Sequence, residues 1–346
     1  MIKFAIVGCG HIAKKHAEAI EKAEGAELFA VCDTIPENME YYIEKYGVEG
    51  YQSLTTLLEQ DDLDVINICT PSGYHANIAI AAANAKKHVV VEKPIALTIE
   101  DTEAIIDACK SNGVKLSVVH PNRFRPAIME LNRVLSDGKT GTLSHANATV
   151  RWNRNQEYYD QAPWRGTKSL DGGVLMNQAI HNLDLMLWTM GDVEEVYSMA
   201  ATRLRNIEAE DVSTGLVRFK NGALGVIEAA TTIYPSNFEE SLAIFGEKAT
   251  IKIGGKTANY IQHWDVEGMD DESVNQIIEQ VKSDPFGKPG HQCIIEDMVQ
   301  AIHEDREPIV TGEDGKKALQ LVLALYKSAD TQKPVKISEV NEREDI

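Results

Sequence analysis

Ile2-Lys-Phe-Ala-Ile-Val-Gly-Cys-Gly-His-Ile-Ala13 is the stretch that decides the fold of the first part of the chain. Its apolar run, residues 2–7, is typical of a buried strand, and a helical pattern follows from Ala13. Between them, Gly8 allows a tight turn, Gly10 lets the backbone approach a ligand, and Ala13 permits close contact between helix and sheet. Because a helix N-terminus favours an anion, this strand–turn–helix unit is expected to bind the pyrophosphate of a dinucleotide.

An acidic residue at the end of the next apolar run refines that expectation. Glu27-Leu-Phe-Ala-Val-Cys-Asp33 reads as a second strand, and Asp33 lies at its carboxyl end. A carboxylate there would bind the adenosine ribose hydroxyls and repel a 2′-phosphate. Thr34-Ile35-Pro36 offers no arginine to receive such a phosphate. The pattern therefore favours NAD over NADP.

Strands and helices continue to alternate up to residue 122, which predicts a doubly wound parallel sheet of the Rossmann type over residues 1–122. Ligands bind such sheets beyond the carboxyl ends of the strands. Three expected strand ends should therefore converge on one crevice: Thr70-Pro71, Glu92-Lys93-Pro94 and Asn122-Arg123. A lysine at a buried strand end is costly without a partner or a task, so Lys93 is a candidate catalytic group. Its alternative role is an ion pair with Glu92 that only fixes the turn.

The periodicity changes from about residue 143. Alternating and β-branched runs predict an α+β domain over residues 123–346, with a large, mostly antiparallel open sheet. Asn221-Gly222 predicts a type I′ hairpin, and 335–337 a last edge strand. We expect a helix over 312–330 that packs back towards the first domain, a homodimer or homotetramer formed through the open sheet, and a mobile acidic tail at 338–346.

One helix in this second half carries an unusual set of polar side chains. After Gly172-Gly173, a helical pattern runs to Met190. The spacings of three and four place Asn177, Gln178, His181 and Asp184 on one helical face. These side chains are candidates for substrate binding and catalysis. The alternative is a set of satisfied polar groups on an exposed helix.

The segment 151–166 is rich in arginines and aromatic residues. It contains Arg151, Trp152, Arg154, Tyr158, Tyr159, Trp164 and Arg165. Arginine suits bidentate contacts with carboxylate or phosphate, and aromatic rings suit stacking on sugars or bases. We interpret the segment as a binding loop. The alternative is an aromatic plug that packs the loop against the domain.

Composition limits the classes of partner. The formal net charge of −19 argues against a nucleic-acid binder, and no apolar run is long enough for a membrane span. The five cysteines are scattered and form no C-x-x-C pair, which favours reduced thiols over disulfides or a zinc site. We therefore expect a cytoplasmic protein without a metal centre.

Four motifs together resemble the Gfo/Idh/MocA oxidoreductases. They are Gly8-Cys-Gly10-His-Ile-Ala13, Thr70-Pro-Ser-Gly-Tyr-His75, Glu92-Lys93-Pro94 and His181-Asn-Leu-Asp184. Within that family the second half is most similar to UDP-N-acetylglucosaminuronate 3-dehydrogenases of the WlbA/WbpB type, which act in surface-polysaccharide synthesis. This second resemblance rests on Gln156-Glu-Tyr-Tyr-Asp160, Trp164-Arg-Gly166, Asp171-Gly-Gly-Val-Leu-Met-Asn-Gln178, Gly246-Glu-Lys248 and Ile261-Gln-His-Trp264.

The resemblance implies NAD-dependent oxidation of a secondary alcohol of a sugar, most simply C3 of UDP-N-acetylglucosaminuronate. His181 is then the general base, Lys93 orients the hydroxyl and stabilises the oxyanion, and Asp184 assists; Lys93 and His181 could exchange roles. The expected cofactor contacts are Gly8, Gly10, His11, Ile12, Asp33, Thr70, Pro71, His75, Glu92, Lys93, Asn122, Trp164 and Arg165. The expected substrate contacts are Lys93, Arg123, Tyr159, Arg165, Asn177, Gln178 and His181.

Other functions stay open at this point. A dehydrogenase of a simpler sugar or inositol would not require the arginine-rich loop. A non-catalytic NAD-binding regulator would be favoured if Lys93 or His181 were missing, and both are present. A dehydratase-like use of NAD and a trans-dihydrodiol type dehydrogenase are also compatible with the residues.

Overall fold

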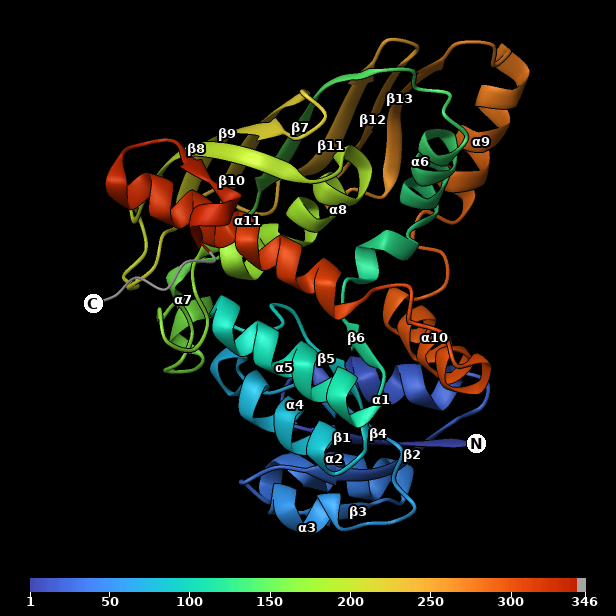
Figure 1. The fold of residues 1–346 in the computed structure, drawn as a ribbon, viewed down its shortest axis with the longest axis vertical. Helices are drawn as coiled ribbons and strands as arrows, with labels where there is room; N and C mark the ends of the chain where they lie inside the picture. The colour runs from blue at the N-terminus through green and yellow to red at the C-terminus, as the bar shows by residue number, and fades with distance from the viewer. Residues whose placement is uncertain (341–346) are drawn as a thin grey trace. The chain divides into compact units, whose positions relative to one another are not determined.

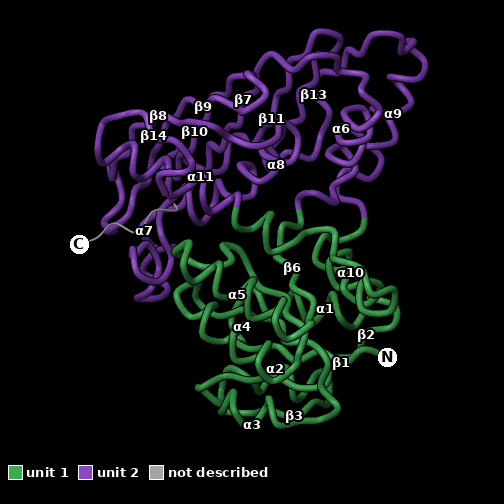
Figure 2. Tube along the Cα trace, in the orientation of Figure 1, with its two compact units in different colours: residues 1–121, 288–316 green, residues 122–287, 317–346 purple. Residues whose placement is uncertain are grey.

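The computed structural model describes residues 1–340, and residues 341–346 lie outside the described part of the chain. The chain divides into two compact units (Figure 2). The first comprises Met1–Pro121 and Lys288–Lys316, and the second comprises Asn122–Gly287 and Lys317–Ile346. The expected boundary at 122/123 thus lies one residue later than the observed one. Residues 288–316, expected in the second domain, belong to the first.

The first unit is a six-stranded parallel sheet in the order β3-β2-β1-β4-β5-β6 (Figure 1). This is the order of a doubly wound Rossmann sheet, so the predicted fold is confirmed. Its strands are β1 (Ile2–Val7), β2 (Ala26–Cys32), β3 (Glu49–Tyr51), β4 (Val65–Ile68), β5 (His88–Val91) and β6 (Leu116–Val118). The order reverses between β1 and β4, whose carboxyl ends form the switch point at which such sheets bind ligands.

Helices cover the strands of this sheet. They are α1 (Ala13–Lys22), α2 (Glu37–Tyr46), α3 (Leu54–Leu58), α4 (His75–Asn84), α5 (Ile99–Asn112) and α10 (Gly290–Glu304), with a 3-10 turn at Ser72–Tyr74. Late in the chain, α10 returns to pack against α1 and β2. Val299 of α10 lies next to Gly25, which explains why residues 288–316 join the first unit.

The second unit is built on an eight-stranded sheet in the order β13-β12-β11-β7-β10-β9-β8-β14 (Figure 1). Only the pair β7–β10 is parallel, so the mostly antiparallel sheet expected from the sequence is confirmed. Its strands are β7 (Leu143–Arg151), β8 (Val193–Ala201), β9 (Val212–Phe219), β10 (Leu224–Ala230), β11 (Glu239–Gly246), β12 (Ala249–Gly254), β13 (Tyr260–Val266) and β14 (Val335–Lys336). The edge strand near residue 335 pairs with β8, also as expected.

The second unit also contains helices, most of which pack against this sheet. They are α6 (Pro126–Ser136), α7 (Gln156–Asp160), α8 (Ile180–Met190), α9 (Asp271–Ser283) and α11 (Gly312–Thr331), with 3-10 turns at Pro121–Phe124 and Ile337–Val340. Two strand glycines allow the close approach of helices. Met186 of α8 lies over Gly225, and Leu325 of α11 lies over Gly215, so a side chain at either position would displace a helix.

Several local expectations change in detail. The hairpin at Asn221-Gly222 joins β9 to β10 as predicted, but the type I′ turn is wrong. That turn needs positive φ at both central residues, and only Gly222 has it. The α11 helix has its first turn, up to Lys316, in the first unit and the rest in the second. Of the expected tail 338–346, residues 341–346 lie outside the described residues. No helix among residues 1–340 is long and apolar enough to cross a membrane.

Candidate functional site

The glycine-rich turn after β1 has the shape that a dinucleotide requires. Gly8 has φ of 92°, and a Cβ on it would come within 2.8 Å of both Cγ2 and the backbone nitrogen of Thr70, so only glycine fits. A Cβ on Gly10, by contrast, would meet no protein atom within 4 Å. The packing of the chain therefore does not require glycine at position 10, and the open space beside it is available to the pyrophosphate.

Asp33 is fixed against the same turn. Its Oδ2 accepts a hydrogen bond from the backbone nitrogen of Cys9 at 2.8 Å, and its Oδ1 accepts one from Ile35 at 2.9 Å. A carboxylate held in this way is oriented before a ligand arrives. The Oγ1 atom of Thr70, across the turn, is buried without a hydrogen-bond partner among residues 1–340. These features fit NAD, with the ribose at Asp33.

His75 lies beneath the turn that follows β4. The ring is fully buried, and its two nitrogens face carbonyl oxygens, Nδ1 that of Pro94 at 2.8 Å and Nε2 that of Thr70 at 3.0 Å. Burial lowers the pKa of His75, and the hydrogen bonds to Thr70 and Pro94 oppose this shift only in part. A neutral ring has one N–H, which it can donate to one of these two carbonyls. His75 therefore joins the turn at Thr70 to the segment around Lys93 from below and presents no face to solvent.

Glu92 is buried beneath the same segment. Its Oε1 lies 3.0 Å from Nε2 of His16 and 3.4 Å from Nε2 of His291, while its Oε2 accepts the backbone N–H of Lys93 at 3.2 Å. Burial by itself would raise the pKa of Glu92, but the two imidazoles lower it well below 4.5. The carboxylate is thus ionised at neutral pH, and it anchors the backbone that carries Lys93.

His16, Glu92 and His291 also form a group whose ligand atoms lie within 4.8 Å of one another, close enough to hold a metal ion. The hydrogen bonds favour another interpretation. Nδ2 of Asn67 donates to Nδ1 of His16 at 3.0 Å, which leaves the proton of the ring on Nε2, facing Glu92. In this arrangement Nε2 of His16 donates to Glu92, and we interpret the group as a hydrogen-bonded cluster.

In the second unit, the helix that carries His181 starts at a buried carboxylate. Oε1 of Glu210 accepts the N–H of Leu175 at 2.8 Å and the hydroxyl of Tyr326 at 3.0 Å. A Cβ on Gly173 would come within 2.0 Å of Glu210, so this glycine is required for the carboxylate to fit. Burial raises the pKa of Glu210 to about 7.

The expected single α-helix from 172 to 190 is wrong in its first part. Leu175–Ala179 forms a π-helical turn, and only Ile180–Met190 is α-helical. Asn177 donates from Nδ2 to Asp171, and Gln178 donates to Oδ1 of Asn177 at 3.2 Å. Asn177 therefore ties the helix to the preceding loop, and Gln178 supports Asn177, while His181, one turn on, is half-buried.

Asp184 and Arg123, assigned to separate roles from the sequence, form one buried pair. Nε of Arg123 donates to Oδ2 at 2.8 Å and Nη2 to Oδ1 at 2.5 Å, and the guanidinium also lies 5.2 Å from the ring centre of Trp188. The two side chains are 4% and 1% exposed. The guanidinium of Arg123, which was expected to contact the substrate, thus pairs with Asp184.

Four other expected contact residues differ in how deeply they are buried. Tyr159 is 5% exposed and its hydroxyl lies 3.3 Å from Oγ1 of Thr231, so it packs inside the unit. Asn122 is also buried, and its Nδ2 donates to Glu240 at 3.3 Å. Trp164 and Arg165 are partly exposed and stack on each other, with 4.8 Å between the guanidinium carbon and the ring centre.

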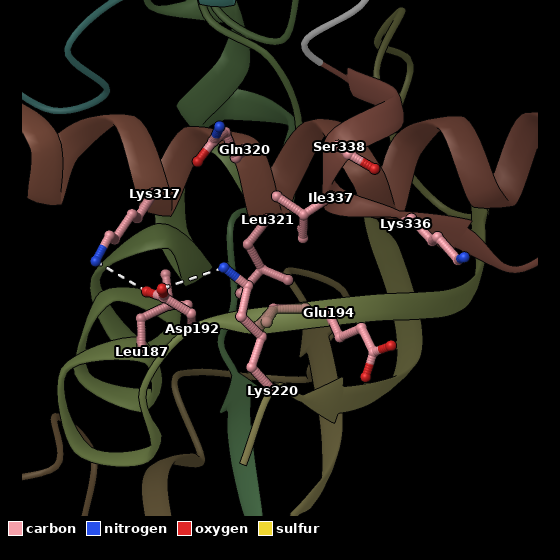
Figure 3. A pocket seen from close by; sticks show the side chains of 11 residues that line it. Leu187, Asp192, Glu194, Lys220, Lys317, Gln320, Leu321, Lys336, Ile337 and Ser338 are labelled. Carbon is pink, nitrogen blue, oxygen red and sulfur yellow. Dashed lines mark hydrogen bonds and ion pairs between the residues drawn. The ribbon is translucent and has the colours of Figure 1, made fainter. Parts of the chain in front are cut away.

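A cavity of about 350 Å³ in the second unit does not coincide with these residues (Figure 3). It lies between Leu187, the start of β8, the α11 helix and the segment 336–338. Asp192, drawn between the two lysines, pairs with Lys220 at 3.4 Å and Lys317 at 2.8 Å. None of the residues assigned to the site from the sequence lines this cavity.

Four residues around the site were missed by the sequence analysis: His16, His291, Glu210 and Tyr326. Only His16 carried a local signal, because it lies three residues after Ala13 on the buried side of α1. The partners of the others come from distant parts of the chain, and no spacing rule connects them.

Comparisons with known proteins agree with this geometry. Residues 2–120 match the family described as the oxidoreductase family with an NAD-binding Rossmann fold, GFO_IDH_MocA. Residues 128–252 match the GFO/IDH/MocA C-terminal domain. Among curated proteins, the myo-inositol 2-dehydrogenase of Thermotoga maritima is 28% identical over 98% of this chain and 99% of its own length.

Two solved structures are more similar in sequence. The WlbA dehydrogenase of Chromobacterium violaceum, in complex with NADH and UDP-GlcNAcA, is 38% identical, with a TM-score of 0.91 over 97% of this chain and 95% of that one. The WlbA dehydrogenase of Bordetella pertussis, with the same two ligands, is 37% identical, with a TM-score of 0.92 over 97% of both chains.

Proposed function

The chain belongs to the Gfo/Idh/MocA oxidoreductase family and is an NAD-dependent sugar dehydrogenase, and we propose that it oxidises C3 of UDP-N-acetylglucosaminuronate (UDP-GlcNAcA) in the synthesis of a surface-polysaccharide precursor. The observation that carries this proposal is the 38% identity, over nearly the whole chain, to a WlbA dehydrogenase that binds UDP-GlcNAcA. The arginine-rich loop after β7 supports it, because an anionic nucleotide sugar needs local cations in a chain with a net charge of −19.

Oxidation of the alcohol at C3 needs one group that accepts the hydroxyl proton and another that accepts the hydride from the carbon. We assign His181 as the base that takes the hydroxyl proton of C3, and Lys93 as the cation that orients this hydroxyl and stabilises the developing oxyanion. Bound NAD would accept the hydride from C3, which leaves a 3-keto sugar. An exchange of roles between Lys93 and His181 is the second assignment. Glu92 supports Lys93 through the backbone, and we assign Asp184, held by Arg123, to keep the helix of His181 in place.

The test is a spectrophotometric assay of NADH formation from NAD and UDP-GlcNAcA. Lys93→Met and His181→Asn should each lower kcat by about 10²–10⁴-fold, because each removes one proton-transfer or charge-stabilising group. The affinity for NAD, measured by calorimetry, should stay largely intact, because most of the expected cofactor contacts are unchanged. Lys110→Met and His303→Asn, at exposed positions, are matched controls. Near wild-type turnover of either site variant would rule out the assigned chemistry.

A dehydrogenase of inositol or a simpler sugar is the second candidate, favoured by the 28% identity to a myo-inositol 2-dehydrogenase. A panel containing myo-inositol, free N-acetylglucosaminuronate and UDP-GlcNAcA separates the two functions. Turnover that requires the UDP group supports the first, and equal turnover of the free sugars supports the second.

We also propose that two or four copies of the chain associate through the open face of the second sheet. Tyr197, Leu216 and Val226 stand opposite one another on β8, β9 and β10, and all three are exposed. A continuous exposed apolar row across three strands is typical of an interface. Leu216→Glu should reduce the mass measured by light scattering to that of a monomer, whereas Lys110→Glu should not; a monomeric wild-type protein would refute the proposal.

The location we propose is the cytoplasm. The five cysteines are free thiols, as suits a reducing compartment. Fractionation of the source cells, with the protein detected by antibody, tests this, and recovery from an extracellular fraction would refute it.

A further inference from the structure

Two loops of the second unit bring three arginines to the end of β10. Arg154 and Arg165 belong to the segment that follows β7, and Arg205 belongs to the segment between β8 and β9. Among residues 1–340, no carboxylate lies within ion-pair distance of any of them, although the chain has 53 acidic against 34 basic residues. Three neighbouring guanidiniums without a counter-charge are unusual in such an acidic protein.

Aromatic rings fix the planes of two of these guanidiniums. The ring of Tyr158 contacts both Arg154, at 5.2 Å, and Arg165, at 4.3 Å, measured from the guanidinium carbon to the ring centre. The ring centre of Trp152 lies 5.0 Å from the guanidinium carbon of Arg154, and that of Trp164 lies 4.8 Å from that of Arg165. A guanidinium stacked by its face keeps its N–H groups at the edge, where they can form paired hydrogen bonds with phosphate oxygens.

Hydrogen bonds connect the two loops to each other and to Thr231. The backbone nitrogen of Arg154 and Nη2 of Arg205 both donate to the carbonyl of Thr231, at 2.9 and 3.2 Å. The loops also meet where Asn206 donates to Oε1 of Gln156 at 2.8 Å. The loop that carries Arg154 and the side chain of Arg205 are therefore fixed at the same carbonyl before any ligand binds, which reduces the entropy lost on binding.

Unsatisfied donors indicate that an acceptor belongs here. The Nε atoms of Arg165 and Arg205 are buried and have no hydrogen-bond partner in the described part of the chain. Buried donors of charged groups are rarely left unpaired in a finished structure. The lysines of the cavity in Figure 3 differ in this respect, because Asp192 already neutralises Lys220 and Lys317.

We propose that Arg154, Arg165 and Arg205 bind the diphosphate of the nucleotide sugar. The inference rests on the proposed function and assigns the part of the substrate that the reaction does not change. NAD also contains a diphosphate, but the turn at Gly8 and Gly10 already provides for it. The arginine cluster is thus a second diphosphate site, and it makes the enzyme selective for UDP-linked over free sugars.

Titration calorimetry of the NADH-bound protein with UDP, UMP and uridine tests the assignment without turnover. Arg154→Gln, Arg165→Gln and Arg205→Gln should each weaken UDP binding about tenfold or more, and uridine binding much less. Arg165→Lys should restore binding only in part, because an ammonium ion cannot form the paired contact. Arg133→Gln on the surface of α6 is the control and should bind UDP as the wild type does.

Three outcomes separate the alternatives. Unchanged UDP affinity in all three glutamine variants would overturn the assignment, as would a loss of NADH affinity in its place, which would make the cluster a cofactor site. If the Arg154 and Arg165 variants do not fold, the UDP affinity of Arg205→Gln still tests the assignment, because Arg205 lies outside the stack. UDP binding that depends on the arginines without turnover of the UDP-sugar would support the subsite and refute the proposed reaction.

Discussion

Arg123 donates two hydrogen bonds, of 2.8 and 2.5 Å, to the carboxylate of Asp184, and both side chains are almost completely buried. The pair joins the segment that enters the second unit to the helix that carries His181. Burying two charges costs free energy. The pair is tolerated because each charge neutralises the other. Removing the charge of one partner should therefore be more destabilising than replacing both partners with apolar residues of similar volume.

Asp184→Asn should destabilise the second unit by about 3–5 kcal/mol, because it removes the charge of the buried carboxylate to which Arg123 donates two hydrogen bonds. Urea unfolding followed by tryptophan fluorescence measures this, since Trp188 lies beside the pair. Asp137→Asn, which breaks only surface ion pairs with Arg133 and Lys139, should cost less than about 1 kcal/mol. Equal losses in the two variants would show that the buried pair adds nothing special.

Asp33→Ala should relax the preference for NAD over NADP. The carboxylate that Cys9 and Ile35 hold in place would repel a 2′-phosphate, and alanine removes this repulsion. We expect the ratio of kcat/KM for NADP to that for NAD to rise about tenfold or more, which corresponds to about 1.4 kcal/mol. Asp61→Ala, at an exposed position, should leave the ratio unchanged. If Asp33→Ala had the same ratio as the wild type, Asp33 would not be the residue that binds the adenosine ribose.

Local patterns were sufficient to predict the architecture. The turn at Gly8, the acid at Asp33 and the strand–helix alternation report directly on backbone geometry, and the structure has a six-stranded parallel sheet in the order they imply. Alternating apolar residues likewise predicted the second sheet. The π-helical turn at 175–179 was not predicted, and its first N–H is bound by Glu210, which lies on another segment and meets the helix start only in the folded chain.

The partners of charged side chains were the weakest part of the sequence analysis. The spacing of His181 and Asp184 indicated a shared helical face but could not show that Arg123 would bind Asp184. Tyr159 was likewise expected in the binding loop and is buried against Thr231. Composition marked the loop as unusual, yet the stacking order of its arginines is a property of the fold.

Glu210 should make the stability of the second unit fall as pH rises. Burial raises the pKa of Glu210 from 4.5 to about 7, so the folded state binds a proton more tightly than the unfolded state. The contribution of Glu210 to the free energy of unfolding is complete below pH 4.5, declines between pH 4.5 and 7, and is absent above pH 7. The total change is on the order of 3 kcal/mol. Glu210→Gln should lack this dependence while keeping an oxygen for Leu175 and Tyr326. Thermal unfolding from pH 4.5 to 8 compares the two, and parallel curves would contradict the assignment.

Glu92 should have the opposite effect on the first unit. His16 and His291 lower the pKa of Glu92 well below 4.5, so the folded state binds the proton less tightly than the unfolded state. The stability that Glu92 contributes is complete above pH 4.5 and is lost as pH falls through its folded pKa. His16 acts in the same direction at higher pH, because burial lowers its pKa below 6.5 and its protonation favours unfolding. Glu92→Gln should therefore be less stable than the wild type at pH 7, and the difference should shrink below pH 4.5. Hydrogen exchange of β5 amides across this range measures the first unit alone, and Glu100→Gln on the surface of α5 serves as the control. A difference that stays constant with pH would mean that Glu92 acts through its shape and not through its charge.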